Sequence, residues 1–207
     1  MKFLKIFLAC IITLIFFNSN NAKACTSTTI TMTVGNCDWI VELCVDCTIG
    51  PAPSTLSVNG YRLSNPSCIP TLTPLQVLAQ IESQVMTYDF IYTYLCDPIQ
   101  NPPPCSTLNP LHWRINHWVC WQMEWYYYFG QYHLVYHPCD YDNYCYEDCD
   151  FCWEPLPPPN GAIIKLCLTP VMVGSVWCTY EGWQVDIPQQ GNGNKSECYI
   201  YHTPCNP

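Results

Sequence analysis

Basic residues are scarce in this sequence, and their scarcity limits the partners that the protein can bind. All 16 acidic residues but only four of the seven basic residues lie after residue 24, which gives that part of the chain a net charge of −12. A surface with this charge repels the phosphates of nucleic acids and of anionic lipids. We therefore expect no nucleic-acid partner.

Long apolar runs are also absent after residue 24, and so are the short motifs of common enzymes. No later segment is apolar enough over a sufficient length to span a bilayer, so we expect no transmembrane segment in the mature chain. The motifs G-x-S-x-G and H-E-x-x-H, the P-loop and the dinucleotide fingerprint are missing. The sequence therefore predicts no catalytic residue, metal or cofactor, although a pair of catalytic carboxylates would leave little trace.

The N-terminal residues have the pattern of a secretory signal. Lys2 and Lys5 precede an uncharged run over residues 6–17, and Ala22-Lys23-Ala24 fits the A-x-A cleavage pattern. We expect residues 1–24 to be removed and the mature protein to be secreted, periplasmic or at the cell surface. A retained membrane anchor and a lipid on Cys25 are the alternatives.

The number of cysteines agrees with an oxidising compartment. Of the 17 cysteines, Cys10 lies in the expected signal, which leaves an even number in the mature chain. Cys44-x2-Cys47 and Cys149-x2-Cys152 have a spacing found in zinc sites, and residues 145–152 have the C-x3-C-x2-C spacing, which resembles that of iron–sulfur radical enzymes. Both kinds of site need reduced thiolates, so we expect disulfides instead.

Short alternating runs separated by glycine-containing pairs predict a fold that is mostly β, with hairpins and a meander in a sandwich-like or irregular sheet. The expected units are a hairpin over Thr29 to Val45 with a type II′ turn at Gly35-Asn36, a hairpin over Leu56 to Leu63 with a turn at Asn59-Gly60, a hairpin over Trp118 to His137 with a turn at Gly130-Gln131, and a meander over Val171 to Ile187.

One segment has helical rather than strand periodicity. Apolar residues recur at spacings of three and four from Leu75 to Leu95, and Thr73, Pro74 and Gln76 have the order of a capping box. The sequence therefore predicts one amphipathic helix from Thr73 to about Cys96, packed against the sheet. We expect residues 25–207 to form a single disulfide-rich domain, with a subdivision near residues 97–110 as the alternative.

The aromatic hairpin contains the candidate site residues. With the turn at Gly130-Gln131, Glu124 would oppose His137, Tyr128 would oppose His133, and Trp125 would oppose Tyr136. We expect one face of the hairpin to be buried and the other to be wet. The buried face would hold Trp121, Trp125, Tyr127, Leu134 and Tyr136, and the wet face Glu124, Tyr126, Tyr128, His133 and His137.

Solvent-facing rings on a rigid sheet suit the binding of a sugar ring or of a protein surface. The candidate ligand-binding residues are therefore Trp118, Tyr126, Tyr128 and His133, and Glu124 with His137 is a candidate acid–base or ion pair. The sequence favours a structural or adhesion-type interaction protein whose partner is a protein or glycan at the cell surface. The alternatives are a carbohydrate-binding module that uses Trp113 to Tyr136 and a small secreted hydrolase.

Overall fold

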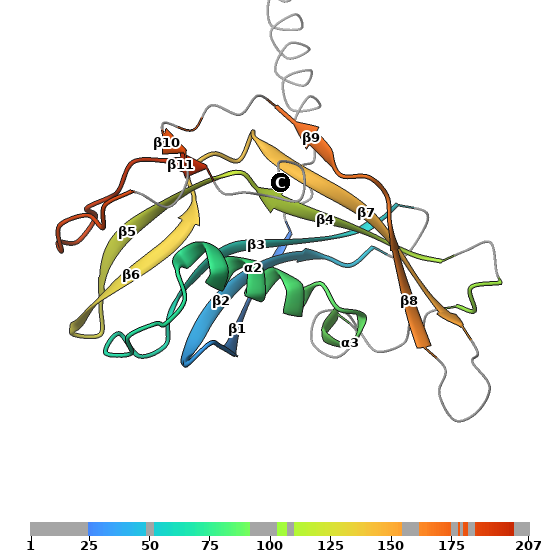
Figure 1. Ribbon diagram of the computed structural model, residues 1–207, viewed down its shortest axis with the longest axis horizontal. Coiled ribbons are helices and arrows are strands. Elements are labelled where there is room, and N and C mark those ends of the chain that lie inside the picture. The colour runs from blue at the N-terminus through green and yellow to red at the C-terminus, as the bar shows by residue number, and fades with distance from the viewer. Residues whose placement is uncertain are drawn as a thin grey trace, which may run out of the picture.

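The fold is built on one large mixed sheet, with helix α2 lying along one face of it (Figure 1). The computed structural model describes residues 25–48, 52–91, 103–106, 110–154, 162–174, 178, 180–181 and 185–200. The predicted signal over residues 1–24 lies outside these ranges. Strand structure dominates the rest, which confirms a mostly β, disulfide-rich fold with an amphipathic helix.

The sheet has 11 strands, of which eight follow one another in the order β10-β11-β5-β6-β3-β4-β7-β8, while β1, β2 and β9 branch from this path. The strands are β1 Thr26–Val34, β2 Cys37–Asp46, β3 Ser54–Leu63, β4 Leu111–Trp118, β5 Cys120–Tyr128, β6 Gln131–Pro138, β7 Tyr144–Glu154, β8 Ala162–Cys167, β9 Val171–Val173, β10 Tyr180–Glu181 and β11 Tyr199–Ile200. The helices are α2 Pro74–Val85 and the single turn α3 Tyr88–Phe90.

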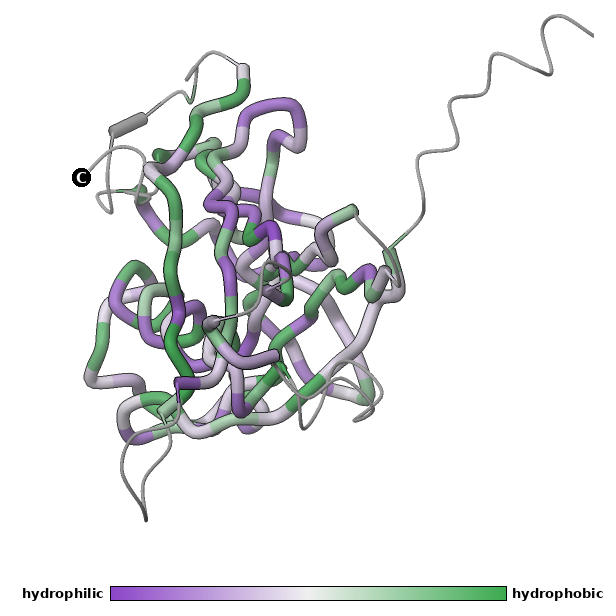
Figure 2. Tube along the Cα trace, turned by 90° about the vertical axis from the view of Figure 1, so that its right-hand side faces the viewer, coloured by the Kyte–Doolittle hydropathy of each residue, from purple (hydrophilic) through white to green (hydrophobic). Residues whose placement is uncertain are grey.

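The first predicted hairpin is confirmed. β1 and β2 pair from Thr26 opposite Val45 to Val34 opposite Cys37, and Gly35 in the turn has a φ of 63°. In β2 every second residue is buried, and the residues between them are exposed or half-buried. Figure 2 shows hydrophobic and hydrophilic residues interspersed along the chain trace. This period of two is the physical basis of the sequence signal, because neighbouring side chains of a strand point to opposite faces.

The second predicted hairpin is wrong, because Asn59-Gly60 lies inside the continuous strand β3. On the β2 side, Glu42 pairs with Gly60 and Leu43 pairs with Val58, so Asn59 is the extra residue of a bulge. On its other edge, β3 pairs in parallel with β4 before the bulge and in antiparallel orientation with β6 after it. Asn59 and Gly60 therefore do not reverse the chain. They bend β3 at the point where the strand paired with its other edge changes from β4 to β6.

β4 and β5 explain how this change of neighbour arises. They are separated by Val119 alone, so the chain from residue 111 to residue 128 is nearly one long strand. Its first part pairs with β3, and its second part pairs with β6, which itself pairs with β3 at Tyr61 and Arg62. β3 and β4, which lie on either side of residues 97–110, are thus hydrogen-bonded neighbours in one sheet.

The predicted meander over Val171 to Ile187 is also wrong where the structure describes it. β9 pairs with β7 and β10 pairs in parallel with β11, so these two strands have different neighbours. β8 pairs with β7 only from Cys149 to Glu154. The earlier part of β7, from Tyr144 to Tyr146, pairs with β9 instead. Gly174 has a φ of 83°, so the expected turn residue has a left-handed backbone. Residues 175–177, 179 and 182–184, which contain most of the expected return strands, lie outside the described residues.

Helix α2 begins as the capping signature predicts. The Thr73 side chain accepts a hydrogen bond from the Gln76 amide, the Gln76 side chain accepts one from the Thr73 amide, and Pro74 opens the helix. Its apolar stripe packs in the core, which also contains Trp39, Leu43, Ile115 and Trp121. The expected C-terminal extent is wrong, since α2 ends at Val85 and Thr87 caps the separate turn α3. Residues 92–96 lie outside the described residues.

A buried ionisable pair connects α2 to the sheet. Glu82 of α2 and His117 of β4 are 6% and 2% exposed, and their Oε1 and Nδ1 atoms are 3.2 Å apart. Burial alone would lower the pKa of His117, but the neighbouring Glu82 carboxylate outweighs burial and raises it. When His117 is protonated, its imidazolium lies beside the Glu82 carboxyl group and forms a buried ion pair between β4 and α2.

Disulfides join segments that lie far apart in the sequence, and every cysteine of the described residues takes part in one. Six pairs have both members among the described residues: Cys25–Cys44, Cys37–Cys68, Cys105–Cys152, Cys120–Cys178, Cys139–Cys198 and Cys149–Cys167. Cys47 and Cys145 are disulfide-bonded as well. These bonds exclude the zinc and iron–sulfur alternatives, because Cys44, Cys149 and Cys152 are committed to other cysteines. The helices of the described residues are all too short or too polar to cross a membrane.

The disulfide pattern predicts the outcome of peptide mapping. Digestion without reduction should release peptides that join Cys120 to Cys178 and Cys139 to Cys198, and thiol labelling of the denatured mature protein should find essentially no free thiol. Four or more reactive thiols, or zinc bound in stoichiometric amount, would contradict these pairings.

The capping box predicts how removal of the Thr73 hydroxyl group affects stability. Thr73→Ala should lower the free energy of unfolding by about 1 kcal/mol, because the Gln76 amide loses its acceptor at the helix start. Ser83→Ala, which removes an exposed hydroxyl within the same helix, is the matched control and should change it by less than about 0.5 kcal/mol. Denaturant unfolding with the disulfides intact measures both. Equal effects of the two substitutions would show that the cap contributes nothing.

Candidate functional site

A groove lies on the face of the sheet that points away from α2 and the core. It crosses β2, β3, β6 and β5 and has a volume of about 480 Å³. Tyrosine is its most frequent residue, and we call it the tyrosine groove. Its lining consists of Glu42, Asn59, Arg62, Tyr126, Tyr127, Tyr128, His133, Val135, His137 and Tyr141.

The bulge in β3 supplies one polar wall of the tyrosine groove. Asn59 Oδ1 accepts hydrogen bonds from the Ser57 hydroxyl at 2.9 Å and from the Trp118 indole at 3.0 Å. Trp118 itself packs edge-on against Tyr141, with ring centroids 5.1 Å apart. The predicted residue Trp118 thus contacts two lining residues, Asn59 and Tyr141, but is not part of the lining itself.

The expected register of the aromatic hairpin is wrong by two residues. Tyr128 pairs with Gln131, so the turn is Phe129-Gly130, and Glu124 opposes Val135 while His137 opposes Gln122. Phe129 and Gly130 have φ values of 47° and 80°, which fits a type I′ turn with glycine in its second position. A shift of two residues preserves the side-chain alternation, so each residue keeps its predicted face.

Exposure along the hairpin also differs from the expected pattern. Trp121 and Tyr136 of the predicted buried face are buried, but Tyr127 on that face is 56% exposed. Tyr126 and Tyr128 of the predicted wet face are 42% and 54% exposed. The reason is that β3 pairs with β6 only near its base, so the tip of the hairpin projects beyond β3 (Figure 1).

Glu124 lies at the centre of a polar cluster beside the groove. Although it does not oppose His137, its Oε2 atom is 3.2 Å from His137 Nε2 by a diagonal contact and 3.1 Å from Lys195 Nζ. Burial alone would raise the pKa of Glu124, but hydrogen bonds from Lys195, Tyr126 and His137 outweigh burial and lower it. Glu124 is therefore a buried anion compensated by several donors.

His133 is held in its neutral form at the boundary of the groove. Burial and the nearby Arg62 cation lower the pKa of His133 below its usual value. In β6, His133 opposes Tyr126, and the two residues form adjacent parts of the lining. A neutral imidazole can both donate and accept a hydrogen bond, which suits a ligand with hydroxyl groups.

The structure brings most of the predicted residues together. Tyr126, Tyr128, His133 and His137 line the tyrosine groove, while Trp118 and Glu124 contact lining residues. Sequence reasoning missed Glu42, Asn59, Arg62 and Tyr141. The alternation of β2 does place Glu42 outward, but nothing local indicates that β6 lies beside β3.

One group of possible metal ligands among the described residues, Glu147, Cys149 and Cys167, does not provide thiolates. Ligand atoms of Glu147, Cys149 and Cys167 lie within 4.8 Å of one another, but the two sulfur atoms form a disulfide and are not thiolates. Asp148 accepts two hydrogen bonds from Arg114, at 2.7 and 2.8 Å. Asp148 thus serves to pair β7 with β4.

Comparison with known proteins identifies no relative: no family model matches the chain, and neither a curated protein nor a solved structure matches it.

The polar cluster predicts a pH-dependent contribution to stability. Glu124→Gln should lower the free energy of unfolding by about 1–2 kcal/mol at neutral pH, because buried donors lose a charged acceptor. Since the pKa of Glu124 is lowered in the folded protein, its stabilisation is complete above the ordinary carboxyl pKa and is lost as the pH falls through the folded value. The difference between wild type and variant should therefore shrink in acid.

Denaturant unfolding at several pH values tests this expectation. Glu42→Gln is the matched control, because Glu42 is an exposed carboxylate of the same groove. It should change the free energy of unfolding by less than about 0.5 kcal/mol. A difference between wild type and Glu124→Gln that is independent of pH would contradict the role of the Glu124 charge.

Proposed function

We propose that this protein is an exported adhesion-type binding protein whose tyrosine groove binds a saccharide chain. The observation that carries the proposal is the run of exposed rings at the hairpin tip, where Tyr126, Tyr127, Tyr128 and Phe129 are 42%, 56%, 54% and 87% exposed. Monomeric proteins seldom expose contiguous large apolar groups without a binding role.

The scaffold behind these rings supports binding with little loss of entropy. Tyr128 belongs to β5, which pairs with β6 on one edge. On the other edge, Trp125 and Tyr127 form hydrogen bonds with residues 192–194. Tyrosine has few rotatable bonds and combines an apolar face with a polar hydroxyl. Such rings match a pyranose, which offers C–H groups on its faces and hydroxyls at its edge.

The polar lining favours a saccharide over a purely apolar surface. Glu42 can accept hydrogen bonds, and Arg62 and the amide nitrogen of Asn59 can donate them. The groove can therefore bind a ligand hydroxyl group either as a donor or as an acceptor. The chain carries a net charge of −9, which disfavours a strongly anionic polysaccharide. A neutral or weakly charged glycan therefore fits best.

The groove supports binding better than hydrolysis. A glycoside hydrolase needs one carboxyl group that holds a proton near neutral pH. Glu124, the carboxylate that the sequence singled out, has a lowered pKa and several donors around it. This environment suits a permanent anion that fixes the base of the hairpin.

Export agrees with the covalent structure. Disulfides persist in oxidising compartments, and every described cysteine forms one. Together with the signal-like pattern of residues 1–24, this supports a location outside the cytoplasm, where a saccharide-coated surface is a common partner.

The proposal predicts the loss of glycan binding in a double variant. Tyr126→Ala with Tyr128→Ala should weaken retention on insoluble polysaccharides or a glycan array by about tenfold or more, because two stacking rings are removed. Trp153→Ala is the control, since Trp153 is 41% exposed but does not line the groove. Circular dichroism confirms that each variant is folded.

Absence of binding to any glycan by the wild-type protein would overturn the saccharide assignment. Equal weakening by Trp153→Ala would show that retention is unspecific. In either case the exposed rings would be interpreted as a surface for a protein partner.

A further inference from the structure

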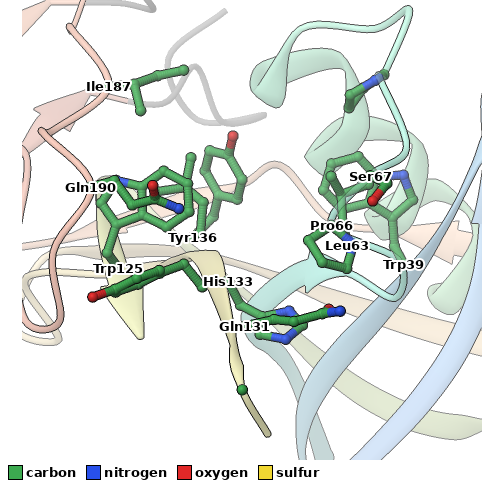
Figure 3. Close-up of a pocket in the computed structure, with 14 residues that line it drawn as sticks. Trp39, Leu63, Pro66, Ser67, Trp125, Gln131, His133, Tyr136, Ile187 and Gln190 are labelled. Carbon is green, nitrogen blue, oxygen red and sulfur yellow. The ribbon is translucent and has the colours of Figure 1, made fainter. Parts of the chain in front are cut away.

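The opposite face of the same hairpin has a second cavity that the tyrosine groove does not explain. Trp39, Leu63 and Pro66 form one wall, and Trp125, Ile187 and Gln190 form the other, with Tyr136 between them (Figure 3). Its volume is about 520 Å³. We call it the aromatic cleft.

A smaller recess adjoins the aromatic cleft. It has a volume of about 190 Å³ and shares Tyr136 and Ile187 with the cleft. Its other walls are apolar or aromatic and include Leu75, Met123 and Val185. Together the two cavities lie in the range that small-molecule sites occupy, and the inner one offers no partner for a charged group.

The lining of the aromatic cleft is electrically neutral. No aspartate, glutamate, lysine or arginine occurs among the described residues that line it. Burial lowers the pKa of His133 and raises the pKa of Tyr136 to about 12, so both side chains are uncharged at neutral pH. A charged ligand would lose its hydration here without gaining a counter-ion.

Three neutral polar side chains lie at the mouth of the cleft, and its two indole N–H groups are not available to a ligand. The two indoles are already satisfied, because Trp39 donates to the Val34 carbonyl and Trp125 donates to the Pro188 carbonyl. They therefore present only ring surface to a ligand. Ser67, Gln131 and Gln190 are exposed and provide neutral donors and acceptors on both sides of the opening.

We propose that the aromatic cleft and its recess form a binding site for an uncharged amphiphilic small molecule. Its apolar ring or chain occupies the space around Tyr136 and extends into the recess, and its hydroxyl or carbonyl head lies between Ser67, Gln131 and Gln190. Ile187, which is 63% exposed, becomes covered by the ligand. The site is distinct from the proposed saccharide groove, because the two linings have only His133 in common.

The neutral probe N-phenyl-1-naphthylamine tests the site in the intact mature protein. Its fluorescence should rise on addition of the protein and should be excited through tryptophan, because Trp39 and Trp125 line the cleft. The anionic naphthalene sulfonate of similar size should bind at least about tenfold more weakly, since a charge is not compensated there. The double variant Tyr126→Ala with Tyr128→Ala should bind the neutral probe like wild type.

Two substitutions at the mouth should weaken probe binding by about tenfold for different reasons. Ile187→Glu places an uncompensated charge beside the apolar body of the ligand, and Ser67→Trp fills the opening with a bulky ring. Leu168→Glu is the matched control, because Leu168 is 70% exposed and lies outside the cleft.

The result expected is weaker binding in both mouth variants and unchanged binding in the control. The proposal is overturned if the neutral probe does not bind, if its emission is not excited through tryptophan, or if the anionic probe binds equally well. It is also overturned if Leu168→Glu weakens binding as much as Ile187→Glu does, or if both mouth variants bind like wild type.

Discussion

The division of one edge of β3 between two partners is the constraint on which the other features of this sheet depend. Each backbone group on that edge can hydrogen-bond to only one neighbouring strand. The first half of β3 pairs with β4, and the second half pairs with β6. The bulge at Asn59 marks the change, and the chain from β4 into β5 diverges from β3 so that β6 fits between them. The aromatic hairpin is therefore held at its base and projects at its tip, with a cavity on each face.

Covalent bonds fix the base of this hairpin. Cys120 opens β5 and is joined to Cys178, while Cys139 follows β6 and is joined to Cys198. Both disulfides tie the hairpin to the C-terminal part of the chain, in which Gly193, Asn194 and Ser196 also form backbone hydrogen bonds with β5. This anchoring brings Ile187 and Gln190 over the sheet and so completes the aromatic cleft.

The two faces of the hairpin differ in charge because the neighbouring strands differ in what they present there. On the outer face, β2 and β3 contribute Glu42 and Arg62, and the Glu124 cluster adds further charge beside them. On the inner face, the same strands contribute Trp39 and Leu63, and the lining is neutral. One hairpin thus borders a polar groove suited to hydroxyl-rich chains and an apolar cleft suited to an uncharged small molecule.

Short-range signals in the sequence determined the elements whose geometry depends on near neighbours. The Gly35-Asn36 turn and the start of α2 at Thr73 follow from backbone dihedrals and from hydrogen bonds between residues a few positions apart. The faces of the aromatic hairpin were also predicted, because side-chain alternation survives a register shift of two residues. The turn at Phe129-Gly130 was missed, since glycine fits the first position of one tight turn and the second position of another. Only the tertiary structure decided that Asn59-Gly60 bends a strand and that Arg62 and Tyr126 share one groove. The physical reason is that hydrogen-bonding edges of strands are chemically alike, so the choice between them rests on packing and disulfides between residues far apart in the chain.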